Sequence, residues 1–304
     1  MLQKYNPVNE NLIYSVNGRL FRRDEPGISP FDSVVQGGDA VWEGLRLYRG
    51  RIFRLTEHLD RLRDSAKALA FGEIPTHDAI TETIRKTLDA NKMYDGVHIR
   101  LTLTRGIKLT SGMDPRLNRQ GPTLIVLAEF KPPVYDKSGL KLATASVRRP
   151  SPDVMDPKIH HNNLINSILA KIEANLAGAD DAIMLDSQGF VAETNATHLF
   201  LVKNGILHTP RIVACPEGIT RSVVLEIAPL IDIPVVVESL SLVDFYRADE
   251  VFCTGTMGEL APVTSIDCRT IGNGQVGLIT TRLSEAFALK VGLEGTMVVN
   301  RPES

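Results

Sequence analysis

Short apolar runs separated by polar turns fill the first third of the chain and predict β hairpins. The stretch NLIYSVNGRLFRRDE places Asn17-Gly18 between two such runs, and GLRLYRGRIFRL places Arg49-Gly50 in the same way. Asn-Gly is a strong signal for a two-residue turn, because both turn residues must adopt positive φ. Farther on, GVHIRLTLTRG alternates with His98 and Arg100 on one face, which predicts a strand, and GPTLIVLAEF predicts a more fully buried one.

Apolar residues recur at helical spacing in two segments between these strands. TEHLDRLRDSAKALAF predicts a helix with Thr56 as its N-cap, and THDAITETIRKTLDANK predicts a second with Thr76 as its N-cap. The apolar stripe of the first helix comprises Leu59, Leu62, Ala66 and Leu69.

The pattern begins again after KPPVYDKSG, residues 131–139, whose prolines and Asp-Lys-Ser-Gly are typical of an interdomain linker. GLKLATASVRR predicts a strand, and a long helix follows. Its apolar stripe comprises Leu164, Ile165, Ile168, Leu169, Ile172 and Leu176. Short strands with turns at residues 187–189 and 204–205 come next. After them we expect a helix in GITRSVVLEIAPL, a strand in IPVVVESL, a short helix and strand in SLVDFYRADEVFCTGT, and a last helix in LITTRLSEAFALKVG. The sequence therefore predicts an α+β fold with domains at residues 1–130 and 140–304.

Composition narrows the class of protein further. The 304 residues are 43% hydrophobic and carry a formal net charge of −2, which does not favour nucleic acid or an acidic membrane as a partner. Three cysteines in a chain of this length do not make a disulfide framework and suit a reducing compartment. The chain has no apolar run of the roughly 18 residues that a membrane helix needs, and MLQKYNPVNENLIYSV lacks a signal-peptide layout. We expect a cytoplasmic protein.

Lys158 is the first candidate for chemistry, because it follows Asp156-Pro157 where a strand is expected to give way to the long helix. A lysine amine lowered in pKa by burial or a nearby cation can form a Schiff base with an aldehyde, although most lysines are solvated. His160 and His161 follow at once and could bind metal, but no CxxC or HExxH spacing accompanies them. GxSxG and P-loop sequences are missing as well, which removes support for serine hydrolysis and nucleotide phosphoryl transfer.

Other candidates lie farther along the chain. Glu193 stands between apolar runs, and a buried carboxylate requires a cationic partner, such as a protonated pyridine or an ordinary basic side chain. The residues Gly218, Ile219 and Thr220 open a helix, where free N–H groups can cradle phosphate, unless Thr220 is simply a cap. CTGTMGE, residues 253–259, combines small and hydroxyl residues around Thr256 and Met257 that allow close approach of an anion or form a plain turn. The arginines Arg61 and Arg63 suit phosphate or a solvated helix face.

The order of these motifs is more specific than any one of them. VWEGLRLYRGRIFRLTEHLDRL, a junction lysine, ETNATHLFLVKNG, PEGITR and GTMGELAPV together resemble the class IV, or fold-type IV, aminotransferases that use pyridoxal 5'-phosphate, with branched-chain amino acid aminotransferases closest. The resemblance spans about residues 41–287. It implies a smaller N-terminal α+β domain, a larger β-barrel-like C-terminal domain with helices, amino acid and keto acid substrates, and a homodimer or higher homo-oligomer.

The resemblance also implies roles. Lys158 resembles the Schiff-base lysine and proton shuttle, and Glu193 the carboxylate that holds the pyridine nitrogen protonated. Arg61, Gly218, Ile219, Thr220 and Thr256 resemble the phosphate-binding set. The implied substrate-binding residues are Trp42, Arg46, His98, Arg100, Thr256 and Met257. We therefore expect a ping-pong transaminase that transfers the amino group of a branched-chain L-amino acid to 2-oxoglutarate.

Several positions depart from the family pattern and leave the substrate open. In branched-chain enzymes a Gly-Gly-Asn-Tyr run typically follows the lysine, whereas IHHNN follows it here, so Asn163 stands where that tyrosine would meet the cofactor's phenolic oxygen. His98 replaces another tyrosine, Trp42 replaces phenylalanine or tyrosine, and Gly37 stands where a pocket tyrosine is common. Alternatives on the same fold are a D-amino acid aminotransferase, an R-selective amine transaminase and 4-amino-4-deoxychorismate lyase. A non-catalytic binding protein and a metal-dependent hydrolase using His160 and His161 are alternatives of other classes.

Overall fold

The computed structural model describes residues 5–301, which divide into two compact units. The first unit contains described residues 5–132, 159–163 and 291–301, and the second contains residues 133–158 and 164–290. The change of unit near residue 132 falls in the segment 131–139, which forms neither helix nor strand. The domain limits given above stay a prediction.

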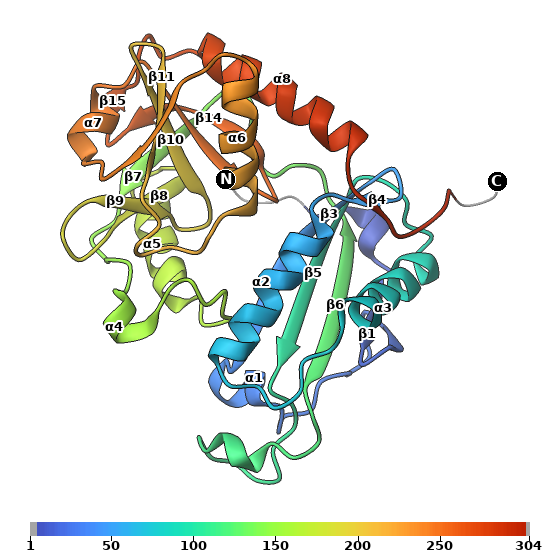
Figure 1. The fold of residues 1–304 in the computed structure, drawn as a ribbon. Coiled ribbons are helices and arrows are strands. Elements are labelled where there is room, and N and C mark those ends of the chain that lie inside the picture. Colours follow the sequence, from blue (N-terminus) through green and yellow to red (C-terminus); the bar gives the residue numbers. More distant parts are fainter. Residues whose placement is uncertain (1–4, 302–304) are drawn as a thin grey trace. The chain divides into compact units, whose positions relative to one another are not determined.

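A seven-stranded antiparallel sheet forms the centre of the first unit (Figure 1). Its order is β16-β4-β3-β5-β6-β1-β2. The strands are β1 Ile13–Val16, β2 Arg19–Arg22, β3 Ala40–Tyr48, β4 Arg51–Ile52, β5 Val97–Thr104, β6 Thr123–Phe130 and β16 Thr296–Met297. The predicted turns are confirmed: Asn17 and Gly18 have φ of 48° and 76°, and Arg49 and Gly50 have φ of 49° and 80°.

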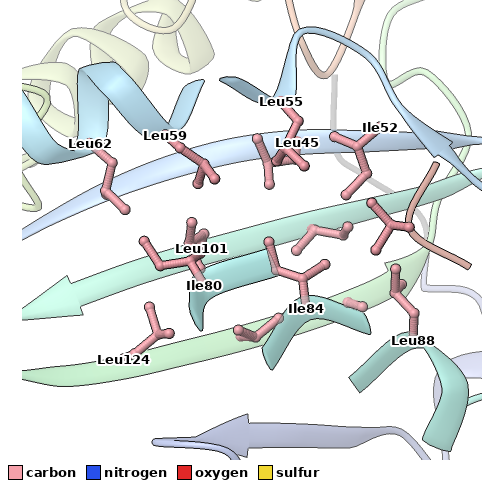
Figure 2. Packing of buried hydrophobic residues seen from close by; sticks show 14 of the residues in the cluster. Leu45, Ile52, Leu55, Leu59, Leu62, Ile80, Ile84, Leu88, Leu101 and Leu124 are labelled. Atoms are coloured by element: carbon pink, nitrogen blue, oxygen red, sulfur yellow. The ribbon is translucent and has the colours of Figure 1, made fainter. Parts of the chain in front are cut away.

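Helices α2 (Leu55–Ala68) and α3 (His77–Ala90) pack on one face of this sheet. Figure 2 shows leucines of β3, β5 and β6 meeting Leu59 and Leu62 of α2 and Ile80 and Ile84 of α3. Each fully buried side chain of this kind contributes roughly 1.5–3 kcal/mol, so this layer is the main core of the unit. Smaller helical elements are η1 Pro7–Asn9, α1 Ser33–Gly37 and η2 Pro115–Leu117.

The two predicted helix caps have different outcomes. Thr76 is confirmed, since its hydroxyl accepts a hydrogen bond from the N–H of Ala79. Thr56 is wrong: the N-cap is Arg54 at φ 53°, two residues earlier, and α2 begins at Leu55. The chain leaves β4 through this left-handed residue and enters the helix directly, which places Thr56 inside the first turn.

A nine-stranded mixed sheet forms the second unit, in the order β12-β11-β10-β13-β14-β7-β8-β9, with β15 paired to β14. The strands are β7 Leu140–Thr144, β8 Asp181–Leu185, β9 Val191–Thr194, β10 His198–Lys203, β11 Ile206–Pro210, β12 Val235–Glu238, β13 Glu250–Gly255, β14 Glu259–Ile266 and β15 Arg269–Thr270. The helices are α4 Pro152–Met155, α5 Ile165–Leu176, α6 Ile219–Leu230, α7 Leu242–Tyr246 and α8 Leu278–Leu293, the last of which continues into the first unit.

Helix α5 forms where its period predicts, but its apolar stripe is exposed. The helix buries Ala170 and Ala174 against a small cluster that includes residues of β8. Ile168 and Ile172 on the stripe are 53% and 48% exposed. Small residues allow the helix to lie close to the strand, and the larger residues are therefore left on the outside.

Among residues 5–301, no helix combines the length and the apolar character needed to cross a membrane.

Candidate active site

Lys158 lies in a loop of the second unit, between α4 and α5, and its side chain is exposed. The expected strand-to-helix junction is wrong, because β7 ends at Thr144 and α4 intervenes. Prolines occur three times in RRPSPDVMDP, and proline cannot donate to a strand ladder. The loop is held locally, since the N–H of Lys158 donates to Asp156 Oδ1 at 3.0 Å. An exposed amine on an ordered loop can reach an aldehyde.

Glu193 lies on β9 and is only 6% exposed, as its apolar neighbours suggest. Arg149 Nη2 lies 2.6 Å from Glu193 Oε1 and offsets the buried negative charge. A carboxylate has about four acceptor positions on its two oxygens. A pyridinium N–H is another cationic donor of the kind that a buried carboxylate accepts.

The N-terminus of α6 has the features of an anion site. Its N-cap is Gly218, and no side chain of the described residues caps the helix there, so the alternative of Thr220 as the cap is wrong. A Cβ at Gly218 would lie 2.2 Å from the imidazole of His198, which makes glycine necessary. The first N–H groups of a helix have no intrahelical acceptor and attract phosphate. This end of α6 fits a phosphate group.

The segment Gly255-Thr256-Met257-Gly258 turns the chain from β13 into β14. The N–H of Gly258 donates to the carbonyl of Gly255 at 3.2 Å, and the carbonyl of Met257 accepts from Val134 at 3.1 Å. A Cβ at Gly258 would lie 2.1 Å from the ring of Tyr135. The glycine therefore permits the turn to pack closely against this ring.

A possible metal-ligand group differs from the one suggested by sequence. Among the described residues, one atom each of Glu193, His198 and Cys215 lie within 4.8 Å of one another. Arg149 lies beside this group, because its guanidinium contacts Glu193. The positive charge of Arg149 opposes binding of a metal cation there. The adjacent histidines of the sequence hypothesis lie in the first unit, where His160 contacts Glu43 and His161 Nδ1 accepts from the N–H of Asn163.

Four predicted substrate residues share one face of the first unit's sheet. Strand alternation puts Trp42 and Arg46 of β3 on the face opposite α2. His98 of β5 pairs with Arg46 of β3 and therefore lies on the same face. The guanidinium of Arg100 lies 3.5 Å from the centre of the Trp42 ring and donates to Asn162 Oδ1 at 2.7 Å. Arg100 is thus held in place by an aromatic face and an amide.

His98 is neutral in this setting. Burial, followed by the charges of Lys131, Arg46 and Arg100, lowers the pKa of His98 to about 3. Neither ring nitrogen has a hydrogen-bond partner among residues 5–301. A neutral imidazole beside three cations can donate to or accept from a polar or anionic group.

Arg61 lies in a buried cluster of the first unit that sequence reasoning missed. Its Nε and Nη2 donate to the two oxygens of Glu43, both at 2.7 Å. His58 Nδ1 and His160 Nδ1 lie 2.6 and 3.0 Å from the same carboxylate. The sequence did contain a sign of this cluster, because Glu43 interrupts the apolar run AVWEGL in the same way that Glu193 interrupts the apolar run around it.

Asn163, another predicted cofactor residue, donates to the carbonyl of Gly38 at 3.1 Å.

Comparisons with known proteins agree on one family. The family model described as amino-transferase class IV matches residues 40–266. A branched-chain-amino-acid aminotransferase-like protein 2 of Arabidopsis thaliana is 56% identical over 92% of this chain and 50% of its own length. The chain therefore spans about half the length of that curated relative. The branched-chain-amino-acid aminotransferase of Pseudomonas aeruginosa is 35% identical over 82% of this chain and 83% of its own.

A solved structure is similar over most of the chain's length. The T.th. branched-chain amino acid aminotransferase, complexed with N-(5'-phosphopyridoxyl)-L-glutamate, superposes with a TM-score of 0.85 at 34% identity. The match covers 92% of this chain and 94% of that one.

Proposed function

Because this chain belongs to the class IV aminotransferases, we propose that it is a pyridoxal 5'-phosphate-dependent transaminase that moves the amino group of a branched-chain L-amino acid to 2-oxoglutarate. The predicted fold class is confirmed, since the mixed architecture matches solved aminotransferases of fold-type IV. The observation that carries the proposal is a set of three groups in the second unit. They are the amine of Lys158, the buried carboxylate of Glu193 and the helix N-terminus that begins at Gly218. The relatives named above and the ligand of the similar structure support the substrate class.

The proposed roles follow from the chemistry of each side chain. Lys158 would hold the cofactor through its aldehyde carbon, whose oxygen would leave as water, and would carry the proton to and from the substrate Cα. Glu193 accepts a hydrogen bond from the ring nitrogen and keeps it protonated. The bound cofactor supplies an electron sink for the bond broken at Cα. Asn163 donates to the phenolic oxygen. The phosphate is held by Arg61, Gly218, Ile219, Thr220 and Thr256.

Substrate binding is assigned to the polar sheet face of the first unit and to the β13–β14 turn. Arg46 and Arg100 provide cations for a substrate carboxylate, and Trp42 and His98 form the wall. Thr256 and Met257 provide backbone and hydroxyl groups. The amino group passes first to the cofactor and then to the keto acid, so the donor leaves as a keto acid before the acceptor binds, which is ping-pong kinetics. One lysine can serve both half-reactions as acid and base.

The direct test is the absorbance spectrum of the pure protein, followed by addition of one amino donor at a time. We expect a band near the visible edge that shifts with L-leucine and returns with 2-oxoglutarate. Lys158→Ala should lose this band and all turnover, whereas Lys203→Ala, which removes a surface lysine paired with Asp249, should keep both. Retention of colour and turnover by Lys158→Ala would refute the assignment.

The same assay separates the alternatives on this fold. Both enantiomers of leucine and R-phenylethylamine, each with 2-oxoglutarate or pyruvate, distinguish L-amino acid, D-amino acid and amine transaminases. Release of pyruvate from 4-amino-4-deoxychorismate would identify the lyase. Cofactor binding without any half-reaction across this panel would favour a binding protein.

We further propose that two copies of the chain associate through the exposed stripe of α5, Ile165, Ile168, Leu169, Ile172 and Leu176. A contiguous apolar surface of this kind on a water-facing helix is typical of an interface. The double variant Ile168→Glu/Ile172→Glu should halve the mass measured by light scattering, whereas Leu230→Glu, at an exposed leucine that ends α6, should not. The described cysteines are unpaired, which supports the proposed cytoplasmic location.

A further inference from the structure

A fully buried carboxylate in the first unit is shared by three side chains, two from α2 and one from the loop after Lys158. Glu43 of β3 is 0% exposed and lies on the side of the sheet that α2 covers. It accepts four hydrogen bonds: two from Arg61 and one each from His58 and His160. Four bonds use the acceptor capacity of a carboxylate, so the orientation of this group is fixed on every side.

Ionisation of Glu43 sets the tautomers of its neighbours. Burial alone raises the pKa of Glu43, but the Arg61 charge and the contact with His160 outweigh it and hold this pKa well below the usual range. An ionised carboxylate only accepts, so His58 and His160 each donate through Nδ1–H. Burial lowers the pKa of His160, and its imidazole is neutral near pH 7.

The guanidinium of Arg61 is thereby fixed before any ligand arrives. Both contacts to Glu43 use the edge formed by Nε and Nη2, a bidentate arrangement that sets the plane of the group. A free arginine side chain has many rotamers and must lose them when it binds phosphate. An arginine that is already ordered avoids most of this loss.

The segment that follows Lys158 is anchored to the same place. On this edge of β3, β4 pairs with Leu47 and Tyr48 at the end of the strand, and residues 160–162 lie along the edge at its beginning. The N–H of Trp42 donates to the carbonyl of His160 at 3.0 Å, and the N–H of Asn162 donates to the carbonyl of Ala40 at 2.8 Å. The imidazole of His160 also stacks on Trp42, with ring centres 4.3 Å apart.

We propose that Glu43 is a positioning residue that orders Arg61 for phosphate binding, and that His160 ties the segment after Lys158 to the same carboxylate. The inference rests on the proposed function and adds two residues to it. His160 stands in the IHHNN run, which departs from the Gly-Gly-Asn-Tyr run of the family pattern.

The test compares cofactor affinity with and without the phosphate group. Dissociation constants for pyridoxal 5'-phosphate and for pyridoxal are measured by spectral titration for the wild type, Glu43→Gln, His160→Gln and the control His208→Gln. His208 has a similar contact with Glu238, at 2.7 Å, in the second unit. Glu43→Gln should weaken the phosphorylated form roughly ten- to hundredfold more than pyridoxal. His160→Gln should weaken it less, and the control should change neither constant.

The results separate the inference from the proposed function. Equal weakening of both ligands by Glu43→Gln would mean a merely structural role and would overturn the inference while the proposed function stands. If the wild type binds neither ligand, the proposed function fails and the phosphate role fails with it.

A second measurement needs no cofactor. Trp42 is the one tryptophan of the sequence, so its fluorescence reports directly on His160. The charged or titratable groups that face His160 are Glu43 of β3, Arg61 of α2 and Arg100 of β5. Protonation of His160 should quench the emission with a midpoint below 6.5, the ordinary histidine value, and His160→Gln should remove this transition. A wild-type curve unchanged by His160→Gln would overturn the contact.

Discussion

Replacement of Arg61 by methionine is expected to destabilise the protein strongly. Methionine keeps most of the length of the side chain but removes the charge and both hydrogen bonds to Glu43, each 2.7 Å long. Glu43 is fully buried, and removal of one partner from a buried ion pair typically costs about 3–5 kcal/mol because the other charge is left unpaired. We expect the free energy of unfolding near neutral pH to fall by this amount. With an m-value of roughly 2 kcal/mol per M, the urea midpoint falls by about 2 M.

The loss should depend on pH in a defined direction. In the wild type the pKa of Glu43 lies below its ordinary value of 4.5. Its ionised form therefore stabilises the fold above that value, and this stability is lost as the pH falls through the lowered pKa. Without Arg61, burial is no longer outweighed by that charge and the pKa of Glu43 rises. The variant can then relieve its buried charge by protonation, so the gap between wild type and variant should narrow toward pH 4.5.

Urea unfolding of the cofactor-free protein, followed by Trp42 fluorescence, measures this effect, because ligand binding would add its own stability. Trp42 lies on β3 beside Glu43 and reports on the unit in question. Arg85→Met is the matched control. Arg85 pairs with Glu82 and Asp89 on the exposed side of α3, and such pairs contribute about 0–1 kcal/mol. A loss below about 1 kcal/mol for Arg61→Met, or a gap that widens as the pH falls, would contradict the reasoning.

Three further outcomes follow from packing and exposure. Gly258→Ala should lower stability by about 1–3 kcal/mol, because the new methyl group would lie 2.1 Å from the Tyr135 ring, whereas Gly72→Ala enters open space and should be neutral in thermal unfolding. A thiol reagent should modify one cysteine of the native protein, Cys268, since burial raises the pKa of the other two thiols; three reactive thiols without denaturant would contradict this. Leu62→Ala, at a fully buried site of α2, should cost about 2–5 kcal/mol in urea unfolding, and a smaller effect would mean that the core closes around the gap.

Local signals in the sequence predict local structure well here. The turn at Asn17-Gly18 needs two residues that tolerate positive φ, and the chain supplies them next to each other. The cap at Thr76 needs one hydroxyl before a helix. The cap at Thr56 fails because the start of α2 depends on the left-handed Arg54, which has no strong sequence preference for that conformation.

Contacts between residues that are far apart in the sequence cannot be predicted from local signals in the same way. The period of α5 predicts a helix, but not that alanines would be buried and the isoleucines exposed, because that depends on how closely β8 approaches. The Glu43 cluster joins β3, α2 and the loop after Lys158, and no spacing in the sequence brings these together. The interruption of an apolar strand by a carboxylate was the available clue, and the same reasoning that singled out Glu193 applies to Glu43.

The discontinuous make-up of the first unit has a consequence for how the chain is made and cut. Its sheet takes an edge contact from residues 160–162, and β16 near the end of the chain pairs with β4. When only residues up to 132 have left the ribosome, the sheet therefore still lacks two of its contacts. Residues 160–162 and β16, which are separated by most of the other unit, must be synthesised and must pair with the sheet before it is complete. A fragment cut at the predicted linker should accordingly be insoluble or readily digested by proteases, and co-expression of the two halves should restore it.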